Sequence, residues 1–269
     1  RWDDFEKSSR FSVQDDNGVL ELMPVADQAF FSTKYINCHP QNPQEGLLSI
    51  VGLGWLAEMH TGYPVLLSEM TLLTALRTAA TSALVTDYCA KPDAREWGIL
   101  GCGAQAEFQI LGLACVRPVE RVFAYDPDVD AMKKFEKNMK AYGIEVVLHD
   151  GPEPVVRAAE GLVTVANRHS AEPLFLTEWL NPGVHINAVG GDVPDKSECP
   201  QDLLHQASLI VEYHEQTLQE GEIHHAPDLP VTSVHELTQG VTPPATPQGW
   251  TLFDSVGFAL EDFSVLLLV

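Results

Sequence analysis

The stretch Trp97–Gln109, WGILGCGAQAEFQ, decides how most of this chain is expected to fold. It begins with the apolar run Trp97–Leu100, which has the length and composition of a buried strand. Gly101 and Gly103 follow at once, and from Ala106 onward the apolar side chains recur at helical spacing. A strand, a glycine-containing turn and a helix in direct succession predict the first unit of a parallel α/β sheet.

The same alternation of strand-like and helical segments continues toward the C-terminus. The amphipathic stretch 127–143 has helical spacing, and short runs rich in β-branched and aromatic residues lie on either side of it. This pattern favours a parallel sheet with helices on both of its faces. The further strands are expected at residues 121–126, 145–149, 161–167, 183–191 and 207–213.

The chain before this stretch is β-rich. Short apolar runs within residues 19–40 and 49–69 are interrupted by Pro, Gly and Asn, which is typical of strands joined by turns. Thr61 and Gly62 separate two of these runs and therefore predict a hairpin between them.

The change of pattern predicts two domains. Ser68 is placed to cap a helix whose apolar spacing extends to Ala90, and the apolar end of the chain predicts another helix. We therefore expect a β-rich domain formed by residues 1–92 and completed by 250–269. Residues 93–249 are expected to form the parallel-sheet domain.

Composition and charge exclude several kinds of partner. The chain has 16 Lys and Arg against 38 Asp and Glu, and its net charge of −22 repels nucleic acid and anionic membrane surfaces. The five cysteines form no C-x-x-C pair, and the ten histidines have no metal-ligand spacing. We expect reduced thiols, no metal and a cytoplasmic location. Because the chain begins at Arg1 rather than Met, we also expect a segment to precede it.

The glycine turn has the spacing of a dinucleotide-binding loop. In Gly101-x-Gly103-x-x-Ala106 the glycines allow a tight turn and a close approach of a pyrophosphate to the backbone. Asp126 ends the next strand, twenty residues after Ala106, where an acid binds the adenosine ribose. Such an acid favours NAD over NADP, because it repels a 2′-phosphate. An alternative is a glycine turn in another α/β domain, with Asp126 capping the helix after Pro127.

A few charged residues stand in apolar surroundings. Lys34 and Arg77 together indicate a pocket for a carboxylate, because Arg offers a bidentate fork and Lys a point charge. An ordinary side chain with its charge in solvent remains an alternative for each of them, more so for Lys34 than for Arg77. Asp192 follows Gly190 and Gly191 at the end of a predicted strand, where ligands bind in parallel sheets. We expect the glycine pair to leave room there for cofactor and substrate.

Six motifs run through nearly the whole chain in a fixed order. They are KYINCHPQNP (34–43), GYPVLLSEMTLLTALRTAATSAL (62–84), GCGAQAEFQ (101–109), HINAVGGDVPDKSE (185–198), VEYHEQTLQEGEI (211–223) and TLFDSVGFALEDF (251–263). Together they resemble the ornithine cyclodeaminase/μ-crystallin family. The forms NAVGGD and SEMTLLTALRTAA are similar to its ornithine cyclodeaminase branch.

The resemblance implies an α/β fold and a set of site residues. It implies a Rossmann-type NAD-binding domain and a β-rich domain that binds substrate and forms a homodimer. Asp192 is implied to be the catalytic acid beside the substrate amino group. The residues implied to bind the substrate are Arg10, Glu21, Lys34 and Arg77. The residues implied to bind the cofactor are Ser49, Thr78, Gly101, Gly103, Ala104, Gln105, Asp126 and Asp192.

The resemblance also implies a reaction. L-ornithine would be converted to L-proline and ammonia, a route of proline biosynthesis in which NAD is retained because there is no net oxidation. Three alternatives stay open: an NAD(P)-dependent amino-acid dehydrogenase, a cyclic ketimine reductase, and a binding protein without catalysis. The length of the diamino acid also stays open between ornithine, lysine and diaminobutyrate, because one methylene changes binding by only about 1–3 kcal/mol.

Overall fold

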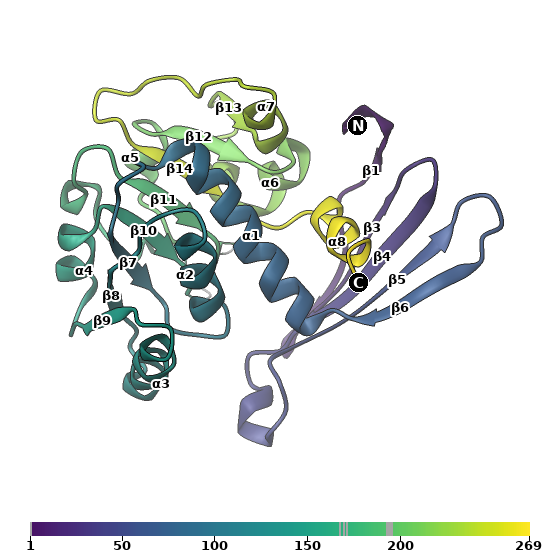
Figure 1. The fold of residues 1–269 in the computed structure, drawn as a ribbon, viewed down its shortest axis with the longest axis horizontal. Coiled ribbons are helices and arrows are strands. Elements are labelled where there is room, and N and C mark those ends of the chain that lie inside the picture. The colour runs from purple at the N-terminus through teal and green to yellow at the C-terminus, as the bar shows by residue number, and fades with distance from the viewer. Residues whose placement is uncertain (1, 167, 169, 171, 192–195) are drawn as a thin grey trace. The chain divides into compact units, whose positions relative to one another are not determined.

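The structure is a computed structural model, and it divides into two compact units. Unit 1 consists of Arg1–Thr78 and Gly257–Val269, and unit 2 consists of Ala79–Val256 (Figure 1). The structure describes all residues of the chain except 1, 167, 169, 171 and 192–195.

Unit 2 contains, within the described residues, an eight-stranded sheet whose neighbouring strands all run parallel. All six strands expected from the sequence lie in it, which confirms the predicted parallel sheet. The sequence missed its two remaining strands, β13 and β14. The spatial order is β13 (Val231–Ser233), β12 (Ser208–Val211), β14 (Thr251–Asp254), β11 (His185–Ala188), β10 (Gly161–Thr164), β7 (Glu96–Leu100), β8 (Arg121–Tyr125) and β9 (Glu145–Leu148).

Helices cover both faces of this sheet, because successive side chains of a strand point to opposite faces. Leu100 packs in one buried cluster with Val155 of a helix on that face. Its neighbour Ile99 packs in a second cluster with Ile110 and Phe135 of two other helices. Unit 2 contains the part of α1 (Thr71–Cys89) that begins at Ala79, and α2 (Ala106–Ala114), α3 (Val129–Lys140), α4 (Pro152–Ala158), α5 (Gln201–Leu204), α6 (His214–Glu220) and α7 (Val234–Thr238).

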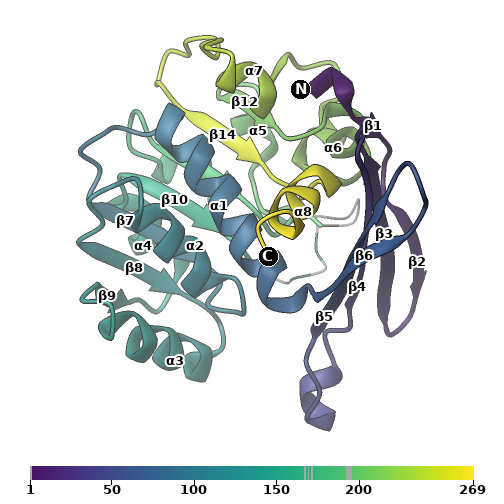
Figure 2. The ribbon, with the colours of Figure 1, turned by 45° about the vertical axis from the view of Figure 1, so that its right-hand side comes forward.

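Unit 1 is an antiparallel sheet with one helix on one of its faces. Helix α8 (Ala259–Leu266) packs on β3, β4 and β5, as Figure 2 shows. The predicted hairpin at Thr61 and Gly62 is confirmed, since the strands on either side of it pair antiparallel. The strand order is β1 (Glu6–Lys7), β3 (Gly18–Ala26), β4 (Phe30–Cys38), β5 (Ile50–Glu58) and β6 (Pro64–Glu69), and β2 (Phe11–Asp15) also pairs with β3.

The boundaries of the two units differ from those expected at 92/93 and 249/250. The first boundary lies inside the continuous helix α1 (Thr71–Cys89). The second follows β14, because this strand pairs with β11 and β12 in the sheet of unit 2. The C-terminal segment is therefore not one helix, as expected, but a strand followed by α8.

The start of α1 also differs from the prediction. Ser68 does not cap the helix but lies within β6. Glu69 takes this role instead: its Oε2 accepts the backbone N–H of Thr71 at 2.9 Å and that of Leu72 at 3.1 Å. The carboxylate thereby satisfies two of the N–H groups that the first turn of a helix leaves unpaired.

All five cysteines are free thiols and lie in the described part of the chain. Burial raises the pKa of Cys102 to about 12 and that of Cys199 well above the ordinary value, so neither is a reactive thiolate at neutral pH. The described residues contain no group of three or more His, Cys, Asp or Glu suited to a metal ion. None of the helices found there has both the length and the apolar character that crossing a membrane requires.

Candidate functional site

Lys34 lies in the middle of β4, on the sheet face that α8 covers. Its Nζ is 2.9 Å from Oδ1 and 2.8 Å from Oδ2 of Asp262 on α8. Both side chains are only 1% exposed. The alternative of a side chain with its charge in solvent is therefore wrong for Lys34. Its charge is instead held in the interior of unit 1 by an ion pair.

Arg77 joins the same group from α1. Its Nη1 is 2.6 Å from Oε2 of Glu261, and its Nε is 3.0 Å from Oδ1 of Asp262. Asp262 therefore contacts two buried cations, Lys34 and Arg77. Gly257 makes room for the guanidinium, because a Cβ there would lie 2.7 Å from Nη1 of Arg77, and its φ of +75° also favours glycine.

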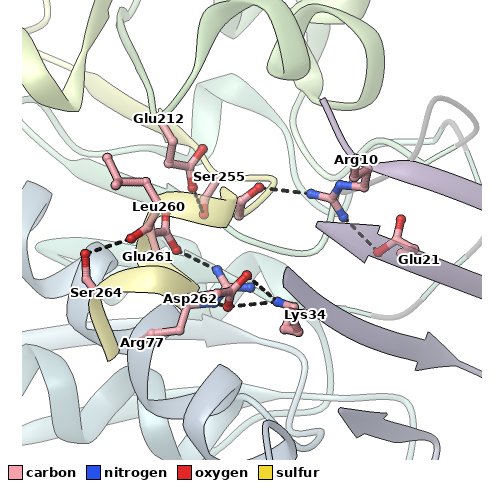
Figure 3. A network of polar contacts seen from close by, with 11 residues as sticks. Arg10, Glu21, Lys34, Arg77, Glu212, Ser255, Leu260, Glu261, Asp262 and Ser264 are labelled. Atoms are coloured by element: carbon pink, nitrogen blue, oxygen red, sulfur yellow. Dashed lines mark hydrogen bonds and ion pairs between the residues drawn. The ribbon is translucent and has the colours of Figure 1, made fainter. Parts of the chain in front are cut away.

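Arg10 completes the group from the N-terminal segment (Figure 3). Its Nη1 is 3.0 Å from Oε2 of Glu21, and its Nη2 donates to the carbonyl oxygen of Gly257 at 3.0 Å. The other carboxylate oxygen of Glu21 accepts the hydroxyl of Ser12 at 3.0 Å. The structure thus assembles all four residues that the sequence assigned to substrate binding in one cluster of unit 1.

Two members of this cation–carboxylate cluster were missed by the sequence reasoning. Glu261 and Asp262 are adjacent acids on a helix whose other side chains are mainly apolar. A pair of acids in such a helix needs buried partners, and this signal could have identified them. We define the cation–carboxylate cluster as Arg10, Glu21, Lys34, Arg77, Glu261 and Asp262.

Burial changes the proton affinities within the cluster. Desolvation, together with the nearby Arg77, lowers the pKa of Lys34 to about 8, and Asp262 offsets only part of this shift. Burial also raises the pKa of Glu261, although Arg77 acts in the opposite direction. Both changes follow from the cost of holding a charge away from water. Protonation of Glu261 would leave the cations in excess, which is the condition for binding an anionic group.

Two residues that the resemblance assigned to the cofactor also lie in unit 1. Thr78 directly follows Arg77 in α1 and is 7% exposed. Ser49 precedes β5 and is half-buried, and its carbonyl oxygen accepts the N–H of His39 at 2.8 Å. Their role in cofactor binding remains a prediction.

The glycine turn in unit 2 has the form of a phosphate-binding loop. Gly101 directly follows β7 and has a φ of +105°, and a Cβ there would lie 2.7 Å from the carbonyl oxygen of Val165. Gly103 is exposed, and apart from Gly103 itself and its two neighbours in sequence, no atom of the described residues lies within 4 Å of the position that its Cβ would take. Ala104 and Gln105 then lead into α2. The open position at Gly103 and the start of a helix fit a pyrophosphate.

Asp126 lies beside this loop, at the end of β8. Its Oδ2 accepts the N–H of Cys102 at 2.7 Å, and its Oδ1 accepts the N–H of Asp128 at 2.8 Å. The alternative role of Asp126 as a helix cap is wrong, because Asp128 caps α3 by accepting from Asp130 and Ala131. The position of Asp126 fits an acid that binds the ribose of a dinucleotide.

Asp192 lies outside the described residues, but the glycine pair before it is described. The position that a Cβ would take at each of these glycines is occupied by a buried side chain, and the room expected there for cofactor and substrate stays a prediction. A Cβ on Gly190 would collide with Glu198, and a Cβ on Gly191 would lie 2.8 Å from Oε1 of Glu222. The sequence reasoning missed both carboxylates, because they follow the pair only at a distance along the chain.

Comparisons with known proteins agree with these features. A model of the ornithine cyclodeaminase/mu-crystallin family matches residues 1–269. The chain is 42% identical over 272 residues to an ornithine cyclodeaminase of Agrobacterium fabrum, a match that covers 100% of this chain and 77% of that protein.

Two solved structures have the same fold. An archaeal alanine dehydrogenase dimer with bound NAD matches with a TM-score of 0.91 and 30% identity, over 99% of this chain and 85% of that one. A lysine cyclodeaminase, described for its recognition of L-lysine, L-ornithine and L-2,4-diaminobutyric acid, matches with a TM-score of 0.89 and 29% identity. That match covers 97% of this chain and 79% of the other. This chain therefore belongs to the ornithine cyclodeaminase/mu-crystallin family.

Proposed function

We propose that this protein is an enzyme that converts L-ornithine to L-proline and ammonia, with NAD as a retained cofactor. The observation that carries the proposal is the meeting of Arg10, Lys34 and Arg77 in one buried cluster of unit 1. Burying a cation is costly even when a carboxylate offsets its charge, and three cations in one cluster can hold the carboxylate of a ligand. The identity of 42% to a protein named ornithine cyclodeaminase supports the choice of substrate.

The three cations would hold the α-carboxylate of the substrate. The guanidinium groups of Arg10 and Arg77 offer planar forks, and Lys34 adds a point charge. Glu21, Glu261 and Asp262 hold these groups in place before substrate arrives, which reduces the entropy lost on binding. Because burial raises the pKa of Glu261, this side chain takes up a proton more readily than an ordinary carboxylate when a second anion enters the cluster.

The glycine turn of unit 2 would hold the cofactor. Gly101, Gly103, Ala104 and Gln105 fit its pyrophosphate, and Asp126 fits its ribose and opposes a 2′-phosphate. When bound, NAD would supply reversible hydride chemistry, so that ornithine yields proline and ammonia without net oxidation. Asp192 would accept a proton from the substrate amine and stabilise the positive charge that develops there.

We further propose that the protein is a cytoplasmic homodimer. The sheet face of unit 1 that α8 does not cover carries exposed apolar side chains, and such patches mark interfaces between proteins. An archaeal alanine dehydrogenase of the same fold is described as a dimer. The five free cysteines are typical of a cytoplasmic protein. The patch comprises Phe11, Val13, Leu20, Leu22, Val51, Leu53, Val65 and Leu67.

The reaction can be tested with the full chain, ornithine and a substoichiometric amount of NAD. Proline and ammonia should form in equal amounts, and many times the amount of NAD present. Lysine and diaminobutyrate serve as competing substrates in parallel reactions. Accumulation of NADH in step with consumed substrate would indicate an amino-acid dehydrogenase instead. Tight ligand binding without turnover of any diamino acid would indicate a binding protein.

A further inference from the structure

Three buried carboxylates lie where strands of the parallel sheet end in unit 2. Asp254 is the last residue of β14, Glu198 comes from a loop, and Glu222 begins the short 3-10 helix η4 (Glu222–His225). Their exposed fractions are 0%, 3% and 1%, respectively. Carboxylates are almost never this buried unless bonds hold them, so their partners indicate their role.

The three side chains are linked through the backbone. The Oδ1 of Asp254 accepts the backbone N–H of Glu222 at 3.0 Å. The Oε1 of Glu222 in turn accepts the backbone N–H of Glu198 at 2.6 Å. Each carboxylate therefore fixes the main chain of the residue that carries the next one. We call Asp254, Glu222 and Glu198 the carboxylate chain.

The carboxylate chain ends on two strand extensions. The Oε1 of Glu198 accepts the N–H of Ala166, two residues after β10, at 2.6 Å. Its Oε2 accepts the N–H of Gly190, two residues after β11, at 2.9 Å. A single buried side chain thus bridges the ends of two adjacent parallel strands.

Each carboxylate of the chain also occupies the space beside one glycine. A Cβ on Gly190 would collide with Glu198, one on Gly191 would lie 2.8 Å from Glu222, and one on Gly221 would lie 2.6 Å from Oδ1 of Asp254. None of these glycines has a positive φ. Close packing, and not backbone conformation, therefore requires these glycines: at Gly191 the close atoms all belong to Glu222, whereas Gly190 also meets the carbonyl oxygen of Ala166 at 2.6 Å and Gly221 also meets Thr217 at 2.6 Å.

We propose that the carboxylate chain positions the backbone of Gly190 and Gly191, the two residues that precede Asp192 in the sequence. Glu198 is then a positioning residue for the reaction. This inference rests on the proposed function, because Asp192 is the catalytic acid of that proposal. Gly190, the residue that Glu198 holds, precedes Asp192 by two positions in the sequence. If the hydrogen bond between Gly190 and Glu198 matters for the proposed reaction, its loss should slow turnover more than it weakens the binding of substrate or cofactor.

The cost of the arrangement supports a role beyond stability. Burial raises the pKa of Glu198 to about 8 and also raises the pKa values of Glu222 and Asp254. Ionised acids held away from water destabilise the fold relative to neutral side chains of similar size. What the carboxylates provide in return is acceptors for several N–H groups at once, which no apolar side chain can offer.

The Glu198→Gln variant tests this role. Glutamine keeps the size but has one acceptor oxygen, so its NH₂ group would face the N–H of Ala166 or Gly190. We expect kcat for proline formation to fall at least tenfold, while KM for ornithine and Kd for NAD change less than twofold. An unchanged kcat, or an equal loss of NAD binding, would overturn the positioning role. The Gly191→Ala variant, which displaces Glu222, should show the same split.

Glu160→Gln is the matched control. The Oε2 of Glu160 accepts the backbone N–H groups of Arg95 at 2.7 Å and Glu96 at 3.1 Å, at the start of β7. It is therefore a carboxylate that also binds two backbone N–H groups of this sheet, but where the strands begin. Its kcat should equal that of the wild type. A loss as large as that of Glu198→Gln would show that any such substitution harms the fold, and would overturn the inference.

A second measurement does not depend on activity. Gly191→Ala should lower the midpoint of thermal unfolding in the wild type and lower it much less in a Glu222→Ala background, because the collision partner is then gone. If Gly191→Ala lowers the unfolding midpoint equally in both backgrounds, Glu222 does not occupy the space beside Gly191, and the inference of a carboxylate chain is overturned. A wild type that turns over no diamino acid would overturn the proposed function alone. The comparison of Gly191→Ala in the two backgrounds would still test the contact within the carboxylate chain.

Discussion

Lys34 is the most deeply buried of the three cations in the cation–carboxylate cluster. Its charge changes with pH near pH 8, a range in which enzyme kinetics can be measured. Its folded pKa of about 8 lies below the ordinary 10.5, because burial and Arg77 oppose the charge. KM for ornithine should therefore rise about tenfold per pH unit above pH 8, as one proton is lost. Kinetics between pH 7 and 10 measure this. In the Lys34→Arg variant this rise of KM above pH 8 should disappear, because arginine stays charged. Any change caused by titration of the substrate's own amines would affect both proteins equally.

The lowered pKa of Lys34 also determines whether the free energy of unfolding rises or falls with pH. Between pH 8 and pH 10.5 the unfolded chain binds the Lys34 proton and the folded chain does not. The free energy of unfolding contributed by this group therefore rises with pH across this window. Below pH 8 the buried lysine is charged, and it then lowers the free energy of unfolding relative to high pH. A role in binding substrate would explain why it is nevertheless present.

Arg77 should not tolerate replacement by lysine. Its fork contacts Glu261 and Asp262 at once, and an ammonium group cannot reproduce two directed bonds. The Arg77→Lys variant should lower kcat/KM for ornithine roughly 10- to 100-fold, because a charge-assisted hydrogen bond contributes about 1.5–3 kcal/mol. Steady-state kinetics decide the matter, and unchanged kcat and KM would remove Arg77 from carboxylate binding.

Asp192 carries the acid–base role in the proposed reaction. The Asp192→Asn variant keeps the size but loses the negative charge and the proton acceptor. Turnover should fall by roughly 10²-fold or more, while binding of NAD persists. Product formation and NAD titration are measured on the same preparation. Near-normal turnover would contradict the assigned role.

Helix α8 contributes two adjacent acids to the cation–carboxylate cluster, and of these Asp262 contacts two cations, Lys34 and Arg77. Asp262→Asn would leave Lys34 and Arg77 without their shared anion, and removing one partner of a buried pair costs about 3–5 kcal/mol. Denaturant unfolding measures the loss. Ser264→Ala, an exposed position on the same helix, is the control and should change stability by less than about 0.5 kcal/mol. Equal effects would contradict the role of Asp262.

The elements that sequence predicted well are those with local signals. The strand, turn and helix at Trp97–Gln109 lie next to one another in the chain, and so their alternation could be read directly. Strand β14 could not be found in this way, because its four residues form a strand only through pairing with β11 and β12 on either side. Asp262 lies 228 residues from Lys34, and only the fold brings the two together.

The two sheets of the molecule differ in what covers them. Buried clusters form on both faces of the parallel sheet in unit 2, so apolar side chains point to both sides of its strands. In unit 1 the strands alternate: in β3, Glu21 and Met23 are buried, whereas Leu20 and Leu22 are each 40% exposed. In an antiparallel sheet with one face in solvent, the exposed face normally carries polar residues. Here the exposed residues of β3, Leu20 and Leu22, are apolar. Such a sheet needs a partner surface.

A second copy of the chain is the partner that we propose for this face. Leu67, on β6, is 69% exposed and is the most exposed member of the apolar patch. Because a twofold interface uses the same patch on both subunits, one Leu67→Glu substitution places two charges in it. The wild type should show twice the mass of one chain by light scattering, and the variant the mass of one. Leu176→Glu, at an exposed leucine of unit 2, is the control and should remain dimeric. A monomeric wild type, or a variant that keeps its dimer mass, would contradict this interface.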